Sequence, residues 1–302
     1  MNQSEMIRAD GMKWKNIHLS PSKIGTWLTC TMMFYYNYIR RIPRRAKVFF
    51  PQGTVIHYAV ELLQNDLAAG KEPDYDYYLM KMEECWLDEL SKEGGEIYDN
   101  KGNILTTMQL SKALAECERW FTMYYMAAKN NEIPDFDPSC VKETELDIMR
   151  EVVHYKHGPL GVSLRGKVDW AIDLDGPVAK LADLKTASTH WMGRWGQAKA
   201  DAQLQCTTYG YITGKDTEFS YVVIPKASEK DKNTTKIEHY KTSRNKHHYM
   251  KLEDVVYNFL IQTDVLNNYE GFVPYPNPKP SATRHCDKLC DFKQICFKEN
   301  FA

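Results

Sequence analysis

The 302-residue sequence has no long hydrophobic run. Its apolar stretches fall far short of the roughly 20 residues that are needed to cross a bilayer. The first residues, MNQSEMIRADGMKWKN, are polar and charged and lack the apolar core of a signal peptide. These absences predict a soluble, intracellular (cytoplasmic) protein with no membrane contact.

The sequence also lacks an excess of charge of either sign. Lysine and arginine number 39, aspartate and glutamate number 40, and the formal net charge is −1. A global basic field is therefore excluded, and any contact with nucleic acid would need a local groove. Hydrophobic residues make up 43% and charged residues 26%, which is ordinary for a globular protein.

Cysteine is present, but a disulfide scaffold is not expected in a chain of this length without a secretion signal. One cysteine lies near the start, four are spread singly and three crowd the end: Cys30; Cys85, Cys117, Cys140 and Cys206; Cys286, Cys290 and Cys296. The four in the middle are most simply free thiols in or near the core.

Hydrophobic periodicity changes at Pro134, from helical spacing before it to strand-like alternation after it. Ser20 or Ser22 is a candidate helix cap, and Asp175-Gly176 predicts a tight turn between two strands. The predicted elements are helices at 52–69 and within about 74–130, strands at 141–155, 162–174 and 178–187, a helix at 198–214, a strand at 219–226, a charged loop at 226–248 and a helix at 249–269.

Two acidic residues and a lysine lie inside these strand-like runs. Asp169 precedes the turn, and Asp183 and Lys185 follow it. Residues two apart on a strand share a face, so the paired strand can bring Asp169 beside the other two. Adjacent carboxylates repel each other and need a cation, and oxygen ligands suit Mg²⁺ or Mn²⁺. The lysine can orient a water molecule or stabilise charge that develops on a phosphate.

A simpler interpretation of Asp-x-Lys is an exposed polar strand face, which is common. Asp173 and Asp175 are better explained as turn residues. The sequence DLDG also fails as a calcium loop, because the remaining ligand positions and the closing glutamate are absent.

Two polar pairs on predicted helices complete a larger pattern. His57 and Glu61 lie four residues apart, as do Gln205 and Tyr209, so each pair shares a helix face. In chain order the motifs are Gly53…His57…Glu61, Gly166-Lys-Val-Asp169, Asp183-Leu-Lys185 and Gln205…Tyr209. Their order and spacing resemble the RecB-like branch of the PD-(D/E)XK nuclease superfamily, over nearly the whole chain.

The resemblance implies an α/β fold with a restriction-endonuclease-like core, in which helices flank a mixed central sheet. It implies a single domain over 1–302, with a helical insertion at about 70–133, a nuclease core at about 140–225, and a C-terminal helix and cysteine segment at about 249–302. The implied activity is a Mg²⁺- or Mn²⁺-dependent deoxyribonuclease, expected to be an exonuclease in DNA processing, recombination or repair, of bacterial or phage origin.

The same resemblance assigns roles to residues. Lys185 would position the attacking water and offset charge on the scissile phosphate. Gln205 and Tyr209 would line the site and contact the DNA backbone, and Glu61 is a weaker candidate for orienting His57. The implied metal ligands are His57, Asp169, Asp183 and the backbone carbonyl of Leu184.

Some members of this branch, the AddB-type and CRISPR adaptation nucleases, hold an iron–sulfur cluster with one early and three late cysteines. Cys30, Cys286, Cys290 and Cys296 match that arrangement, and four thiolates suit a [4Fe–4S] cluster. The first late spacing is C-x3-C, where C-x2-C is commoner. A zinc site that uses the same cysteines or His285 is the alternative.

Two other classes of function compete with the nuclease hypothesis. A DNA end-binding or scaffold protein on a degenerate nuclease fold would usually have lost the aspartate or the lysine. A zinc-stabilised interaction module would leave the motifs of 164–209 unexplained. Tyr35, Tyr36 and Tyr38 are candidates to stack on unpaired bases, with a core position as the commoner alternative. No G-x-x-x-x-G-K-[ST] motif occurs, so a helicase or recombination motor would be a separate partner.

Overall fold

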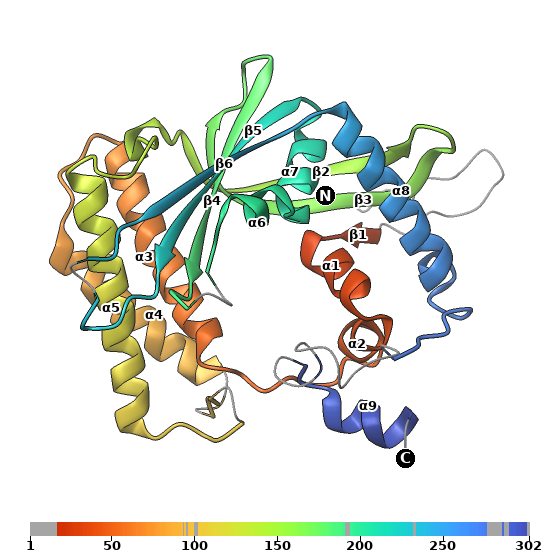
Figure 1. Cartoon of the computed structure of the whole chain (residues 1–302), viewed down its shortest axis with the longest axis horizontal. Helices are drawn as coiled ribbons and strands as arrows, with labels where there is room; N and C mark the ends of the chain where they lie inside the picture. Colours follow the sequence, from red (N-terminus) through yellow and green to blue (C-terminus); the bar gives the residue numbers. More distant parts are fainter. Residues whose placement is uncertain are drawn as a thin grey trace, which may run out of the picture.

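A computed structural model of the chain describes residues 17–92, 94, 96–99, 102–190, 194–231, 234–276, 286 and 290–300. Six strands of this part form one mixed sheet, and helices cover both of its faces (Figure 1). The predicted α/β class, a mixed sheet flanked by helices, is confirmed. None of the helices in the described ranges has the length and apolarity to cross a membrane.

The elements follow the chain in this order. The strands are β1 (Ile17–Leu19), β2 (Glu143–His154), β3 (Gly158–Asp173), β4 (Val178–Ala187), β5 (Asp216–Pro225) and β6 (Glu238–Arg244). The helices are α1 (Pro21–Thr29), α2 (Thr31–Phe34), α3 (Phe49–Ala68), α4 (Tyr75–Lys92), α5 (Thr107–Lys129), α6 (Gln197–Asp201), α7 (Leu204–Thr213), α8 (Lys246–Thr263) and α9 (Lys293–Asn300), with short helical segments η1 (Tyr35–Ile39), η2 (Pro138–Cys140) and η3 (Val265–Asn267).

The long strand β3 organises the sheet. Along one edge it pairs antiparallel with β2. Its other edge is shared, because Leu164 pairs with Leu19 of the parallel strand β1, whereas Trp170 pairs with Ala182 of the antiparallel strand β4. β4 then pairs parallel with β5, and β5 pairs antiparallel with β6. Between its two partners on the shared edge, β3 has a short stretch that includes Gly166 and Asp169.

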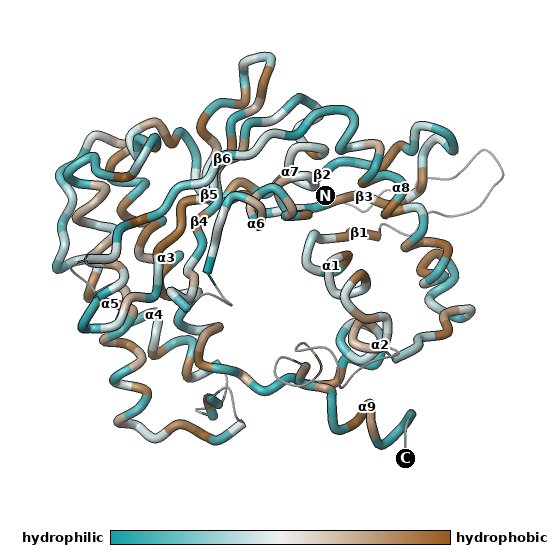
Figure 2. Tube along the Cα trace, in the orientation of Figure 1, coloured by the Kyte–Doolittle hydropathy of each residue, from teal (hydrophilic) through white to brown (hydrophobic). Residues whose placement is uncertain are grey.

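Side chains of β4 and β5 alternate between two cores, as the two-residue period of a strand requires. One set packs against α3, α4 and α5: Ala182, Leu184, Val222 and Ile224. The other set packs against α6 and α7: Leu181, Phe219, Tyr221 and Val223. Figure 2 shows these two strands and α3 as largely hydrophobic, so both strands are buried on both faces.

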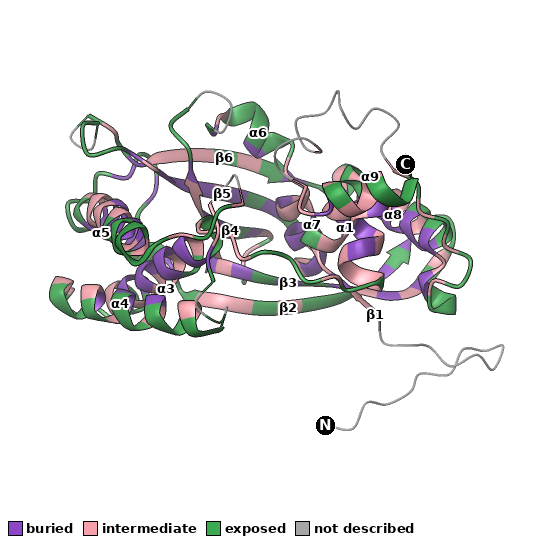
Figure 3. Cartoon of the chain, turned by 90° about the horizontal axis from the view of Figure 1, so that it is seen from below, coloured by how far each residue is buried: buried purple, intermediate pink, exposed green. Residues whose placement is uncertain are grey.

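A third core lies at the far end of the β2–β3 hairpin. There α1 and α8 pack on the sheet, and Trp27 and Phe34 both meet Phe259 edge-to-face, with ring centroids 5.4 Å apart. Figure 3 shows buried residues where α1, α3 and α8 contact the sheet and exposed residues along much of β2 and α4. The helices therefore cover the two ends of the sheet separately.

The predicted helix starts are largely confirmed. Ser20 caps α1, since its Oγ accepts from the backbone N of Lys23 at 3.2 Å. Cys30 then adopts an extended conformation between α1 and α2. The helical region of 74–130 consists of α4 and α5, and Thr106 with Gln109 forms a capping box at the start of α5. The division into insertion, nuclease core and C-terminal segment stays a prediction.

Two expectations about elements are wrong. The charged stretch predicted as a loop over 226–248 contains β6, whose sequence EHYKTSR is polar throughout because the strand lies at the edge of the sheet. The helix predicted over 198–214 is broken, since Ala202 ends α6 and Gln203, in an extended conformation, precedes α7. This break places Gln205 in the first turn of α7.

Candidate active site

The predicted acidic residues meet where β4 separates from β3. Trp170 and Ala182 are paired across the two strands, and beyond them β4 continues in contact with β5 alone. The backbone N of Leu184 is thereby freed from strand pairing and donates to Asp169 Oδ2 at 2.8 Å. The carboxylate of Asp169 therefore satisfies a backbone donor that the separation of the strands exposes.

Asp183 and Lys185 point the same way from β4, as their spacing predicts. Asp183 is buried, with 1% of its surface exposed, and Oδ2 forms an ion pair with Lys185 Nζ. Apart from this ion pair, Oδ2 has no hydrogen-bond partner. Burial and the nearby Asp169 carboxylate raise the pKa of Asp183 to about 6, against the opposing effect of Lys185. A divalent cation beside this buried carboxylate would favour its charged form.

His57 reaches the same place from α3. Its Nδ1 lies 3.3 Å from Asp169 Oδ2. Burial is the largest influence and opposes the charged imidazole, but the hydrogen bond to Asp169 and the charges of Asp169 and Asp183 together outweigh it, and the pKa of His57 is raised. For Asp169 burial opposes the charged form, while His57, Lys185 and the Leu184 N–H favour it, and its pKa is lowered. The pKa values of the two aspartates are thus shifted in opposite directions although the two side chains share one site.

Gln205 and Tyr209 hold the buried carboxylate from α7. Gln205 Nε2 donates to Asp183 Oδ1 at 2.6 Å and lies 3.0 Å from the Tyr209 hydroxyl. That hydroxyl donates to the carbonyl of Lys167 at 2.7 Å, on the stretch of β3 between β1 and β4. Through these hydrogen bonds, α7 is connected to β4 at Asp183 and to β3 at Lys167.

Gly166 permits this arrangement. A Cβ atom at this position would lie 2.3 Å from Cε1 of Tyr209, so only glycine lets the tyrosine ring pack on the strand. At Gly53, the first residue of the helical motif, an added Cβ would meet nothing within 4 Å. Packing therefore requires a glycine at position 166 but not at position 53.

The suggested role of Glu61 does not match its surroundings, because the carboxylate partner of His57 is Asp169. The pKa of Glu61 is raised by burial and by the nearby Glu145, against the opposing effect of Lys167. Lys167 also forms an ion pair with Glu145. The sequence analysis missed these two residues, although Lys167 lies two positions before Asp169 and the alternation of β3 could have indicated it.

The site brings together side chains that suit a divalent cation, with an ammonium group beside them. In the described ranges, however, no three His, Cys, Asp or Glu side chains form a group that could by itself hold a metal ion. Of the predicted site residues, the structure gathers His57, Asp169, Asp183, Lys185, Gln205 and Tyr209 with the backbone of Leu184.

A family model described as the PD-(D/E)XK nuclease superfamily matches residues 18–297. The chain belongs to the PD-(D/E)XK nuclease superfamily. The site above is therefore the candidate active site of a nuclease. A solved structure titled "Crystal structure of SSO0001" is similar at 10% identity, with 93% of this chain and 86% of that chain covered and a TM-score of 0.38. No curated protein matches the chain.

The four cysteines predicted to act together also lie close together in the structure. Cys30, Cys286, Cys290 and Cys296 line one small cavity of about 20 Å³, along with apolar side chains that include Tyr36 and Phe292. Burial raises the pKa of Cys296 to about 11, and the other three thiols act in the same direction. His285, the alternative zinc ligand, lies outside the described residues.

The remaining four cysteines are dispersed. Cys117 and Cys206 are buried and Cys85 is half-buried, as predicted, but Cys140 is exposed in η2. Burial raises the pKa of Cys117 to about 12, so this thiol stays protonated. Of the tyrosines suggested to stack on bases, Tyr36 is fully buried and donates to Glu299 Oε2 at 2.8 Å. The core alternative therefore holds for Tyr36.

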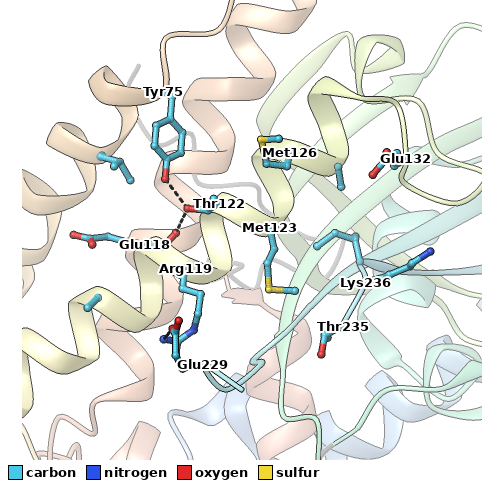
Figure 4. A pocket seen from close by; sticks show the side chains of 14 residues that line it. Tyr75, Glu118, Arg119, Thr122, Met123, Met126, Glu132, Glu229, Thr235 and Lys236 are labelled. Atoms are coloured by element: carbon cyan, nitrogen blue, oxygen red, sulfur yellow. Dashed lines mark hydrogen bonds and ion pairs between the residues drawn. The ribbon is translucent and has the colours of Figure 1, made fainter. Parts of the chain in front are cut away.

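Larger cavities lie elsewhere, and two of them bear on the site. One, of about 690 Å³, adjoins the active site, since Gln205 and Tyr209 line it together with His18, Ser22 and Arg165. The other, of about 1040 Å³, lies between α4, α5 and the segment after β5 (Figure 4). Its lining includes the Tyr75–Thr122 hydrogen bond and the Arg119–Glu229 ion pair, but none of the predicted site residues. The cavity of about 1040 Å³ therefore does not coincide with the candidate active site.

Proposed function

We propose that the protein is a Mg²⁺- or Mn²⁺-dependent deoxyribonuclease of the RecB-like branch. The observation that carries the proposal is the meeting of four separate motifs at one point. His57 lies 3.3 Å from Asp169, Leu184 N lies 2.8 Å from the same carboxylate, and Gln205 lies 2.6 Å from Asp183. These motifs come from α3, β3, β4 and α7, which are separate elements of the fold.

Asp169, Asp183, the carbonyl of Leu184 and His57 would hold the cation. The buried Asp183 carboxylate supports this assignment, because burial and the nearby Asp169 disfavour its charged form, which a divalent cation would favour. When bound, the cation would supply Lewis acidity and a more acidic water.

Lys185 acts on the reacting phosphate. Its side chain is 26% exposed, whereas that of its partner Asp183 is 1% exposed, so the ammonium lies at the solvent side of the pair. From there it positions a water molecule and offsets negative charge on the scissile phosphate.

Gln205 and Tyr209 act mainly by holding Asp183 and the β3 backbone in place. Their second role is contact with the DNA backbone, since both also line the adjoining cavity of about 690 Å³. A cavity lined by the two residues of α7 that adjoin Asp183 is a natural path for the substrate strand.

The second part of the proposal concerns Cys30, Cys286, Cys290 and Cys296, which would hold a [4Fe–4S] cluster. Their convergence on one apolar cavity supports the assignment. Cluster thiolates are commonly shielded by apolar side chains, which control solvent access. Zinc on the same thiols is the alternative, and iron and sulfide analysis of anaerobically purified protein separates the two.

The test of the function is digestion of end-labelled linear DNA and of closed circular DNA with Mg²⁺ or Mn²⁺. Release of labelled ends with circular DNA intact is expected for exonuclease action. EDTA and the Lys185→Ala variant should both abolish it. Cleavage that persists in EDTA would reject the metal-dependent mechanism, and absence of any cleavage by metal-loaded protein would reject the nuclease.

A further inference from the structure

The charges of the chain are unevenly distributed in a way that the net charge of −1 hides. Residues 11–60 contain no aspartate or glutamate, but they contain eight lysines and arginines. The rest of the chain therefore carries a formal charge of −9. Five of the eight cations fall within residues 40–47, immediately before α3. Such a cluster attracts an anionic partner.

Folding uses only part of this cluster. Arg40 pairs with Glu299 at 2.8 Å and Lys47 pairs with Asp291 at 2.5 Å, so these two hold the C-terminal segment. The other three, Arg41, Arg44 and Arg45, are exposed and form no ion pair with a carboxylate of the described chain.

Two exposed phenylalanines follow the arginines directly. Phe49 is 37% exposed and Phe50 is 46% exposed, and their ring centroids are 4.4 Å apart. The Arg44 guanidinium lies 5.9 Å from the centroid of the Phe50 ring. Isolated exposed apolar residues are ordinary, but a ring pair beside an arginine that forms no ion pair in the described chain has the chemistry that binds a stacked base and its phosphate.

The segment leads into the active site. Figure 1 shows the connection between α2 and α3 crossing the side of the molecule opposite the sheet before it enters α3. His57 lies seven residues after Phe50 on this helix, a rise of roughly 10 Å at the helical rise per residue. A strand that lies on the phenylalanines is therefore within a few nucleotides of the site.

We propose that residues 41–50, here called the basic aromatic segment, bind a single strand of DNA and guide it to the active site. The phosphates contact Arg41, Arg44 and Arg45, and unpaired bases stack on Phe49 and Phe50. Stacking needs a free base face, so the segment selects single-stranded over duplex DNA. The proposal deepens the nuclease function and rests on it.

The first experiment measures binding of fluorescein-labelled dT20 by anisotropy in EDTA, where no cleavage occurs. The Phe49→Ala/Phe50→Ala variant should bind about tenfold more weakly, with duplex binding unchanged. Tyr77→Ala is the matched control, because Tyr77 is 39% exposed and Lys81 lies 5.8 Å from its ring centroid. Equal affinity of the wild type and the Phe variant, or an equal loss on duplex DNA, would overturn the stacking role.

The second experiment measures the salt dependence of the same binding. The Arg41→Gln/Arg44→Gln/Arg45→Gln variant should lower the slope of log K against log salt by about 2, since each phosphate contact on a single strand contributes roughly 0.7. The control changes three lysines of α4 and α5 that are already paired with carboxylates: Lys81, Lys92 and Lys129. An unchanged slope in the arginine variant, or an equal fall in the control, would overturn the phosphate contacts.

Failure of this proposal and failure of the nuclease function are separable. Hydrolysis of thymidine 5′-(4-nitrophenyl phosphate) with Mn²⁺ reports on the active site without a long strand. The segment variants should keep this activity while they lose dT20 binding. If the wild type hydrolyses neither substrate, the nuclease function fails, and the anisotropy result still decides whether the segment binds single strands.

Discussion

The carboxylate site and the cysteine cavity are both built from segments far apart in sequence, but the chain supports them differently. At the carboxylate site the strands of the sheet fix the positions, and Leu184 N–H, Gln205 and Lys185 each contact an aspartate. The cysteine cavity adjoins a core of only three buried residues, Met32, Tyr36 and Phe292.

This difference shows where an inorganic ligand would contribute to structure. The carboxylate geometry follows from strand pairing and helix packing, so it exists before any cation binds. The cysteine cavity has a small core, and a cluster bound there would add to the contacts that Tyr36, Arg40 and Lys47 make with the C-terminal segment. A catalytic metal would therefore matter for rate, and a cluster would matter for stability.

The largest expected effect is on the rate of cleavage. Asp183→Ala and Lys185→Ala should each reduce cleavage about 1000-fold, a loss of about 4 kcal/mol of transition-state stabilisation. Lys185→Ala should still bind DNA, and both variants should keep the iron content of the wild type. Lys180→Ala, which changes an exposed lysine of the same strand, should cleave normally. Normal cleavage by Asp183→Ala would show that the site is elsewhere.

The next effect is on stability and concerns the cysteines. Cys30→Ser or Cys296→Ser should lower the free energy of unfolding by about 4 kcal/mol, the order expected when a link closing a loop of this length is lost. Cys30 and Cys286 are 256 positions apart. Urea unfolding with visible absorption and metal analysis measures both properties.

Cys85→Ser, a half-buried thiol outside the cavity, should leave colour and stability unchanged. A colourless wild-type protein with one zinc per chain would replace the cluster by zinc and leave the carboxylate chemistry standing.

A smaller effect distinguishes the two motif glycines. Gly166→Ala should lower the free energy of unfolding by about 3 kcal/mol, because the added methyl group overlaps the Tyr209 ring. Cleavage should fall about tenfold with it, as Gln205 loses the support of that tyrosine. Gly53→Ala has room and should raise stability by about 0.5–1 kcal/mol, since alanine favours the helix. Thermal unfolding that ranks the variants the other way would contradict the packing of Tyr209.

The smallest effect sharpens the contrast between the two aspartates. The raised pKa of Asp183, about 6, means that its charge costs stability above pH 6 and that this cost disappears below about pH 4. In EDTA at pH 8, Asp183→Asn should raise the free energy of unfolding by about 2 kcal/mol, with the gain fading toward pH 4.

Asp169→Asn should do the opposite. Because the pKa of Asp169 is lowered, its charge adds stability above its unfolded pKa, and this contribution is lost as the pH falls. Urea unfolding of both variants at pH 8 and pH 4.5 measures the two signs. A shift of the same sign for both would show that charge is not the cause.

Much of the fold could be predicted where side-chain pattern and burial agree. The β3–β4 hairpin was predicted from alternation and the Asp175-Gly176 turn, and the burial of β4 and β5 on both faces explains their apolar runs. β6 could not be predicted, because an edge strand does not need apolar side chains. β1 is only three residues long, too short for a periodic signal.

The site was predictable as a set of residues but not as a geometry. The motifs identified Asp169, Asp183 and Lys185, but no local pattern states that β4 leaves β3 just after Ala182. That separation depends on which strand occupies each edge of β3, a property of the whole sheet. The basic aromatic segment was missed for another reason, since the net charge conceals a local cluster.

The contacts of Tyr36 have a consequence for how the protein is made. Its hydroxyl bonds to Glu299, 263 residues further along the chain. A ribosome adds about 5–20 residues per second, so an interval of roughly 13–50 s separates the synthesis of the two partners. During that time the nascent chain carries α1 and α2 without their C-terminal neighbour. Until then Tyr36 lacks its contacts with Phe292 and Glu299, so a chain truncated before α9 would leave this ring without those partners.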